Sequence, residues 1–159
     1  MAAQRFCTFF VEDQFFGVPV QQVQEVIQCQ EVTRVPLAPK VIRGLINLRG
    51  QIVVAVDLRR RFEMSERPES QPPMNVVVRT DDGAVSFLVD EIGDVVEADE
   101  EDCEPPPETL AGLARELVLG VHKLRDRLML VLDTERAMGG GAARESEQPQ
   151  ILQDFGGCQ

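Results

Sequence analysis

The sequence has no tryptophan or tyrosine, a single histidine (His122), and four cysteines that form no CxxC pair. A zinc site needs cysteine and histidine ligands at close spacing, so the sequence predicts no such site. No apolar run approaches the roughly 20 residues of a membrane helix, and residues 1–10 lack the long apolar segment of a signal peptide. We therefore expect a cytoplasmic protein with no cofactor, no metal and no direct insertion into a membrane.

Basic residues are also few. The 16 lysines and arginines stand against 27 aspartates and glutamates, for a formal net charge of -11. Nucleic-acid binding depends on basic side chains that neutralise phosphates, so this balance argues against a nucleic-acid partner.

A chain of 159 residues is long enough to form one compact domain with its own core.

Catalytic groups are scarce as well. No serine stands in a GxSxG motif, and the glycines of residues 43–50 form neither a GxGxxG motif nor a phosphate-binding loop. His122 is the only imidazole, and its place within an apolar run favours an ordinary strand histidine with one solvated face. These absences predict a binding module and not an enzyme.

The sequence does contain a series of short apolar runs separated by turn signals, which is typical of an all-β protein. The runs cover residues 4–11, 14–18, 51–58, 74–80, 84–90, 116–124 and 128–133. Residues 81–83 and 125–127 predict hairpin turns between neighbouring runs, although the second turn has no glycine or asparagine.

Helical patterns are fewer. Residues 20–29 have apolar side chains at helical spacing after Pro19 and predict one short amphipathic helix. Two more short helices are expected, one that follows Asp57 and one that begins at Asp133 as its N-cap. The arginines of residues 59–61 are interpreted as the solvated face of the first of these.

Two segments differ in composition from the rest. Residues 97–108 contain seven carboxylates and three prolines and predict an extended, solvated loop. Residues 139–159 begin with three glycines and continue mostly with polar residues, so we expect a flexible tail after a folded domain of residues 1–138. No internal repeat is obvious from sequence identities.

The segment VIRGLINLRGQIVVAVDLRRRF, residues 41–62, closely resembles the signature of the CheW family of bacterial chemotaxis adaptors. Further stretches of the chain resemble the same family, and together they cover residues 4–138. They are FVEDQFFGVPVQQVQEVI with the strand before it, FLVDEIGDVVEADEEDCEPPP, and LVLGVHKLRDRLMLVLDTERAM. One departure is Val54, which stands where the family usually has proline.

The resemblance implies a fold of two small five-stranded SH3-like barrels, packed side by side with an apolar core between them. It also implies a non-enzymatic adaptor that couples the histidine kinase CheA, through the kinase's regulatory domain, to the cytoplasmic hairpin tip of methyl-accepting chemotaxis receptors. The receptor hairpin would lie in the groove between the barrels.

The resemblance further implies a set of partner-binding residues. Arg49 would be an interface anchor that Gly50 sets in a tight turn, exposed in the monomer; a structural arginine bonded to its own turn is the alternative. Positions matched to the family place Val23 and Glu25 on a helix turn facing the partners, and they place three more residues on the groove wall. These three, for which core packing is an equal alternative, are Val76, Ile92 and Val95.

Two other functions remain open at this stage. The chain could be an adaptor of a parallel pathway that controls pili or another output. It could also be a β-barrel that encloses a small ligand, as some all-β domains do. Against the second, barrels of this size would be filled by their own side chains.

Overall fold

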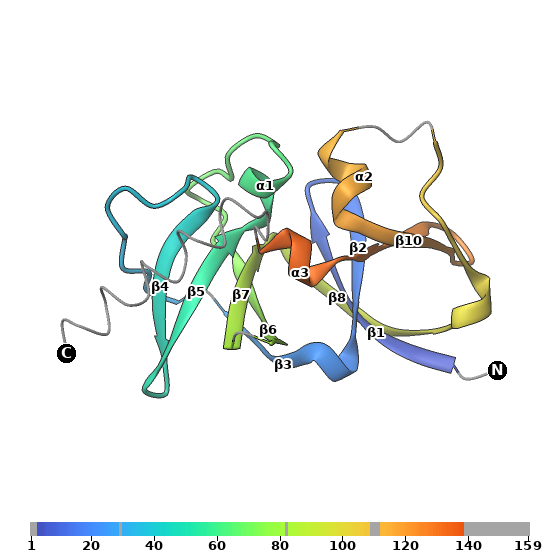
Figure 1. The fold of residues 1–159 in the computed structure, drawn as a ribbon, viewed down its shortest axis with the longest axis horizontal. Coiled ribbons are helices and arrows are strands. Elements are labelled where there is room, and N and C mark those ends of the chain that lie inside the picture. The colour runs from blue at the N-terminus through green and yellow to red at the C-terminus, as the bar shows by residue number, and fades with distance from the viewer. Residues whose placement is uncertain (1–2, 29, 82, 109–111, 139–159) are drawn as a thin grey trace.

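The structure is a computed structural model that describes residues 3–28, 30–81, 83–108 and 112–138 of the chain. Two small β-barrels lie side by side in it, as Figure 1 shows. The prediction of a flexible tail at residues 139–159 lies outside the described residues.

The first barrel is a six-stranded sheet in the order β8-β1-β2-β11-β10-β9. Its strands are β1 (Ala3–Val11), β2 (Gln14–Pro19), β8 (Glu91–Asp99), β9 (Cys103–Glu104), β10 (Val118–Lys123) and β11 (Leu128–Leu132). The second barrel is a five-stranded sheet in the order β3-β6-β7-β5-β4. Its strands are β3 (Val23–Ile27), β4 (Ile42–Leu48), β5 (Gln51–Asp57), β6 (Met74–Thr80) and β7 (Gly83–Val89). The expected all-β class and two-barrel arrangement are confirmed, with the short β9 as an additional strand.

Two of the three expected helices are present. Asp57 caps α1 (Leu58–Arg61) and Asp133 caps α3 (Thr134–Ala137), each through its carboxylate. A third helix, α2 (Leu113–Leu117), was not expected. No helix in the described ranges combines the length and the apolar character needed to cross a bilayer.

The predicted helix over residues 20–29 is wrong. A single 3-10 turn, η1 (Val20–Gln22), leads into strand β3 at the edge of the second barrel. Val20, Val23, Val26 and Ile27 are all β-branched, and such side chains fit a strand better than a helix. Their apolar spacing resembled a helix period because the turn and the strand each bury part of the segment.

The acidic segment is less irregular than expected. Strand β8 continues to Asp99, the 3-10 turn η2 (Glu100–Asp102) follows, and Cys103 and Glu104 form β9 against β10. The prediction of an extended loop is therefore wrong for the first part of this segment. Backbone pairing to the neighbouring strands outweighed the low strand propensity of its acidic side chains.

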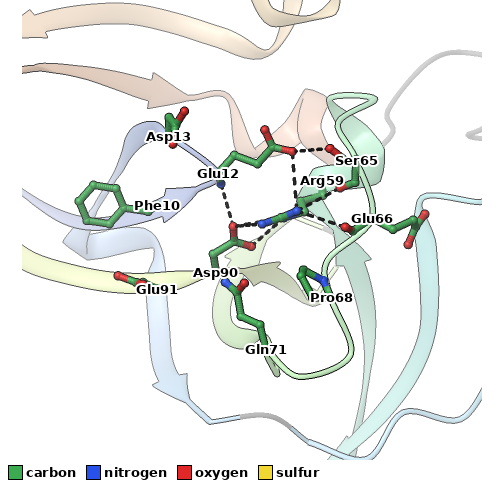
Figure 2. A pocket seen from close by; sticks show the side chains of 10 residues that line it. All are labelled: Phe10, Glu12, Asp13, Arg59, Ser65, Glu66, Pro68, Gln71, Asp90 and Glu91. Carbon is green, nitrogen blue, oxygen red and sulfur yellow. Dashed lines mark hydrogen bonds and ion pairs between the residues drawn. The ribbon is translucent and has the colours of Figure 1, made fainter.

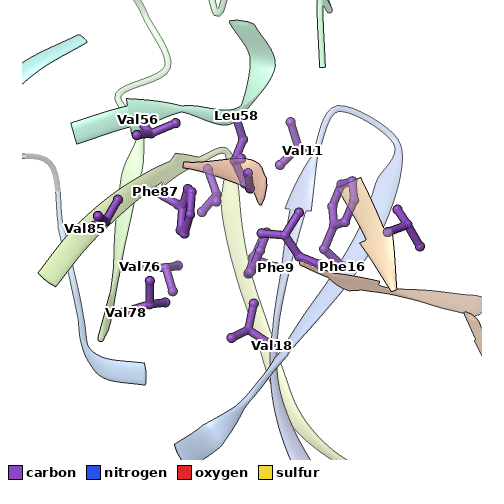
Figure 3. Packing of buried hydrophobic residues seen from close by; sticks show 14 residues of the cluster. Phe9, Val11, Phe16, Val18, Val56, Leu58, Val76, Val78, Val85 and Phe87 are labelled. Carbon is purple, nitrogen blue, oxygen red and sulfur yellow. The ribbon is translucent and has the colours of Figure 1, made fainter. Parts of the chain in front are cut away.

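Buried apolar side chains form three clusters. The largest lies between the barrels, and Figure 3 shows side chains of both sheets meeting in it, among them Phe9 and Phe16 from the first barrel and Phe87 from the second. A second cluster, with Ile46, fills the second barrel, and a third, with Phe6, fills the first. Because strand side chains alternate in direction, a strand such as β6 contributes to its own barrel and to the shared core.

The structure reveals an internal repeat that sequence identity alone did not make obvious. Residues 41–62, which form β4, β5 and α1, align without a gap with residues 117–138, which form β10, β11 and α3. Identical residues occupy several equivalent positions: Gly44 and Gly120, Leu48 and Leu124, Arg49 and Arg125, Asp57 and Asp133, and Arg60 and Arg136.

The backbones of the two repeats agree in detail. The first strand of each hairpin has a register shift at the same place. The amide of Asp57 donates to the carbonyl of Val41 and the amide of Asp133 donates to that of Leu117, both at 2.8 Å. β5 runs parallel to β7 and β11 runs parallel to β2, so each repeat occupies the same place in its own barrel.

Val54, which stands where the family usually has proline, pairs with strands on both sides. Proline would pair poorly there because it has no amide hydrogen to donate.

Candidate partner-binding site

The turn between β4 and β5 has a tightly defined backbone. Arg49 and Gly50 have φ values of 54° and 86°, so both lie in the left-handed region that tight hairpin turns require. A Cβ on Gly50 would meet no atom within 4 Å, which shows that glycine is needed there for its backbone angle and not for space. The amide of Gly50 also donates to the side-chain oxygen of Asn47 at 2.9 Å.

Arg49 is exposed, with 76% of its side chain accessible, as an interface anchor requires. Its Nη1 lies 2.9 Å from Oε2 of Glu25, which is mostly buried on β3. β3 and the β4 end of the sheet are opposite edges of the second barrel, so this ion pair bridges them. The sequence singled out both residues but did not predict that they pair.

Two of the predicted groove residues are apolar and accessible. Ile92 is 36% exposed and Val95 is 58% exposed, both on β8 at the edge of the first barrel. Val23 is partly buried and packs against the core between the barrels. The two accessible apolar candidates thus both lie on β8, whereas Val23, on the edge strand β3 of the second barrel, is only partly accessible.

Val76 is not available to a partner. It is 0% exposed and lies in the core between the barrels, so its prediction as a groove-wall residue is wrong. Val76 is on β6, which is covered by β3 on one side and β7 on the other. Core packing, the alternative given for Val76, is correct because β6 is an interior strand of its sheet, whereas β8 is an edge strand.

Accessible apolar residues that the sequence did not single out lie near Glu25 and Arg49 in the chain. Val26 follows Glu25 on β3, and Ile52 lies just after the Arg49 turn, paired with Asn47. Leu37 is fully exposed with a φ of 65°, in the loop before β4. An exposed aliphatic residue has no distinguishing mark in a single sequence, so only the structure finds these.

The three consecutive arginines are not a solvated face, contrary to prediction. Arg59 is 8% exposed and Arg61 is 9% exposed, while Arg60 is half-buried and pairs with Glu66 at 3.1 Å. A short helix packed in a junction between two barrels turns successive side chains toward different neighbours. The three consecutive arginines therefore lie in different environments, although their side chains are identical.

Arg59 belongs to a buried charge cluster centred on Asp90. The Asp90 carboxylate accepts hydrogen bonds from Nη2 of Arg59 at 2.6 Å, from Nε of Arg67 at 2.9 Å and from the amide of Glu12 at 2.8 Å. Arg59 also lies 3.7 Å from the Glu12 carboxylate, and Figure 2 shows it between Asp90 and Glu12. Three segments that are distant in sequence meet at one carboxylate.

The cluster perturbs the groups in it. Burial alone would raise the pKa of Asp90, but hydrogen bonds from Arg59, the Glu12 amide and Arg67 outweigh it and lower the pKa below its ordinary value. The hydrogen bond to Asp90 raises the pKa of Arg59 against the opposing effect of burial. Both groups are therefore charged throughout the physiological range.

Asp57 extends the cluster within the second barrel. Its carboxylate accepts from the amide of Arg59 at 3.0 Å and from Nη1 of Arg43 at 2.9 Å, and it lies 3.5 Å from Nη2 of Arg67. Arg67 thereby bridges Asp57 and Asp90. We call Arg59, Arg67, Asp57 and Asp90 the junction cluster.

A pocket of about 560 Å³ opens beside the junction cluster. Figure 2 shows its lining, in which Phe10 lies near the carboxylates of Asp13 and Glu91. Across the described parts of the chain, no three His, Cys, Asp or Glu side chains are placed to hold a metal ion.

His122 is a core residue. It is 2% exposed, so the predicted solvated face is wrong, and its ring lies 5.3 Å from that of Phe6 inside the first barrel. In the internal repeat it occupies the position of Ile46, which fills the second barrel. The structure thus defines a β protein with exposed turn and edge residues and with its one imidazole enclosed.

The comparisons with known proteins agree with this architecture. The family model of the CheW-like domain matches residues 5–140, so the chain belongs to the CheW family. It is 30% identical over 135 residues to the chemotaxis protein CheW of Klebsiella aerogenes, covering 85% of this chain and 81% of that protein. It is 27% identical over 148 residues to the chemotaxis protein CheW of Bacillus subtilis, covering 93% and 92%. The crystal structure of the scaffolding protein TtCheW from Thermoanaerobacter tengcongensis superposes with a TM-score of 0.76 at 27% identity, covering 83% of this chain and 90% of that one.

Proposed function

We propose that the protein is a non-enzymatic chemotaxis adaptor in the cytoplasm that couples the histidine kinase CheA to chemoreceptors. The family match over almost all of the described residues supports this function. The single structural observation that carries it is the Arg49 turn, which presents an exposed guanidinium on a backbone fixed by two left-handed residues. A rigid, exposed arginine is a typical hot spot of a protein interface.

The proposed contact surface has two halves. One is the β3 edge with Val23 and Glu25, next to Arg49, and the other is the β8 edge with Ile92 and Val95. The regulatory domain of CheA and the helical hairpin tip of the receptor are the proposed partners. Membrane arrays would recruit the adaptor through these partners.

A small-ligand function has less support. The interiors of both barrels are filled by the protein's own side chains. The pocket lies at the junction cluster and is lined mainly by polar and charged groups, whereas small-molecule sites are predominantly apolar.

The test is the affinity of Arg49→Ala for the kinase regulatory domain and for a receptor-tip fragment, measured by titration calorimetry. Loss of a hot-spot arginine costs at least about 2 kcal/mol, so affinity for one of them should fall about thirtyfold or more. The melting curve should barely change, because an exposed ion pair contributes at most about 1 kcal/mol.

Arg125→Ala is the matched control, because Arg125 occupies the equivalent turn position in the first barrel and is also exposed. It should leave both affinities within a few-fold of the wild-type values. Unfolding of Arg49→Ala would show that the arginine is structural. A separate experiment, co-purification from native cells, would identify the cognate kinase and receptor. Their identity would show whether the adaptor serves chemotaxis or a parallel pathway.

A further inference from the structure

Helix α1 of the second barrel contacts the first barrel in two directions. Arg59 donates to Asp90 and lies beside Glu12, in the turn between β1 and β2. Arg61 donates from Nε to the carbonyl of Ala137 at 3.1 Å and from Nη2 to that of Arg136 at 2.9 Å, at the end of α3. Two residues of one short helix therefore tie the second barrel to two separate elements of the first.

The internal repeat shows that this arrangement is one-sided. The positions of α3 equivalent to Arg59 and Arg61 are Glu135 and Ala137. α3 offers backbone carbonyls to the other barrel where α1 offers guanidinium groups. The arginines are therefore not required by the strand-turn-helix unit itself, which forms without them in the first barrel.

Asp90 occupies the crossing point between the barrels. It follows the last residue of β7 in the second barrel and precedes the first residue of β8 in the first. Its amide donates to the carbonyl of Phe10 at 2.9 Å, and its carboxylate is held by Arg59. Ile92 lies only two residues further along, so the contacts of Asp90 fix the start of the β8 edge.

The apolar core between the barrels cannot supply this constraint by itself. Burial of apolar surface is non-directional, so the hydrophobic effect does not by itself select one contact angle between two sheets. The planar guanidinium of arginine, by contrast, binds at fixed angles, and Arg59 contacts Asp90 through both Nε and Nη2. The core holds the barrels together, and the arginine contacts add directional bonds between them.

We propose that Arg59 and Arg61 are positioning residues that fix the orientation of the first barrel relative to the second. Through Asp90 they set the spacing between the two halves of the partner surface, β3 with Glu25 and β8 with Ile92. Only this last consequence rests on the proposed function. The orientation itself is a property of the free protein.

The test is a set of residual dipolar couplings measured by NMR on the full-length chain, without any partner. Wild-type couplings from both barrels should fit one common alignment tensor. In Arg59→Met and in Arg61→Met, each barrel should still fit its own tensor, but the two tensors should differ in orientation or magnitude. Arg61→Met removes hydrogen bonds to the backbone carbonyls of Ala137 and Arg136, away from the Asp90 carboxylate, so it decides the question if Arg59→Met does not fold.

Ile46→Ala is the matched control, because Ile46 is buried within the second barrel only. It should lower the melting temperature and leave the common tensor intact. A common tensor in both arginine variants would overturn the proposal, as would separate tensors in Ile46→Ala.

A binding measurement then separates the two proposals. Affinity for a partner that spans both surface halves should fall tenfold or more in the arginine variants at a temperature where they are folded, and should stay unchanged in Ile46→Ala. If the wild-type protein binds neither CheA nor receptor, the proposed function fails while the coupling data still decide the orientation. Unchanged affinity with separate tensors would overturn the link between orientation and spacing.

Discussion

The two barrels are built on the same strand-turn-strand-helix unit, yet the two copies differ at the hairpin turn and around the aspartate that caps the helix. The turn of the second barrel has two left-handed residues, Arg49 and Gly50, and its arginine is paired with Glu25. At the equivalent turn positions of the first barrel, neither Arg125 nor Asp126 has a positive φ. One backbone plan therefore supports two different surfaces.

The capping aspartates show the same divergence. Asp57 and Asp133 both cap the helix that follows their strand. The Asp57 side chain is 1% exposed and also pairs with buried arginines, whereas that of Asp133 is 19% exposed and caps α3 at the surface. Both aspartates have the same local role, and Asp57 has a second role in the junction between the barrels.

The largest expected effect comes from breaking these two caps in parallel. Asp57→Ala removes a cap and leaves Arg67 and Arg43 without one of their carboxylates, so it should cost about 3–5 kcal/mol of unfolding free energy. Asp133→Ala removes a cap alone and should cost about 1 kcal/mol. Urea denaturation of both variants measures the difference. Equal losses would mean that the buried charges around Asp57 contribute little beyond capping.

Acid should weaken the second barrel's contact with the first. Because the folded state lowers the pKa of Asp90, that group stabilises the protein above its unfolded pKa, near 3.8, and the contribution is lost as the pH falls through the folded pKa. The wild type should therefore exceed Asp90→Asn in stability by a constant amount near neutrality, and the gap should narrow below about pH 4. Denaturation curves from pH 7 to pH 3 measure it. A gap that stays constant to pH 3 would contradict the assignment.

Much of the fold could be predicted from the sequence because short apolar runs and turn residues mark most strands directly. Hydrophobic spacing failed at β3, where a 3-10 turn before a strand imitates a helical period. The prediction from composition failed at the acidic end of β8, where pairing with β1 decides the structure and local propensity does not. Both errors concern edge segments, whose conformation depends on a neighbour that is distant in sequence.

The exposure of the candidate site residues could be predicted only where it depends on a local feature. The exposure of Arg49 follows from a glycine turn, which is a local feature. The burial of Val76 and of Arg59 depends on how two barrels pack, and no local pattern records that. The local sequence around a valine or an arginine does not indicate whether its strand or helix lies at the surface or in the junction between the barrels.

The smallest expected effect concerns the difference in backbone between the two turns. Gly50→Ala places a Cβ on a residue with a φ of 86°, and strain in the left-handed region should cost about 1–2 kcal/mol, although there is open space around the new atom. Asp126→Ala, at the equivalent exposed position, should cost less than about 0.5 kcal/mol. Thermal denaturation of the two variants tests this directly. If Gly50→Ala melts with the wild type, the turn relaxes freely, and the Arg49 side chain is then not presented on a fixed backbone.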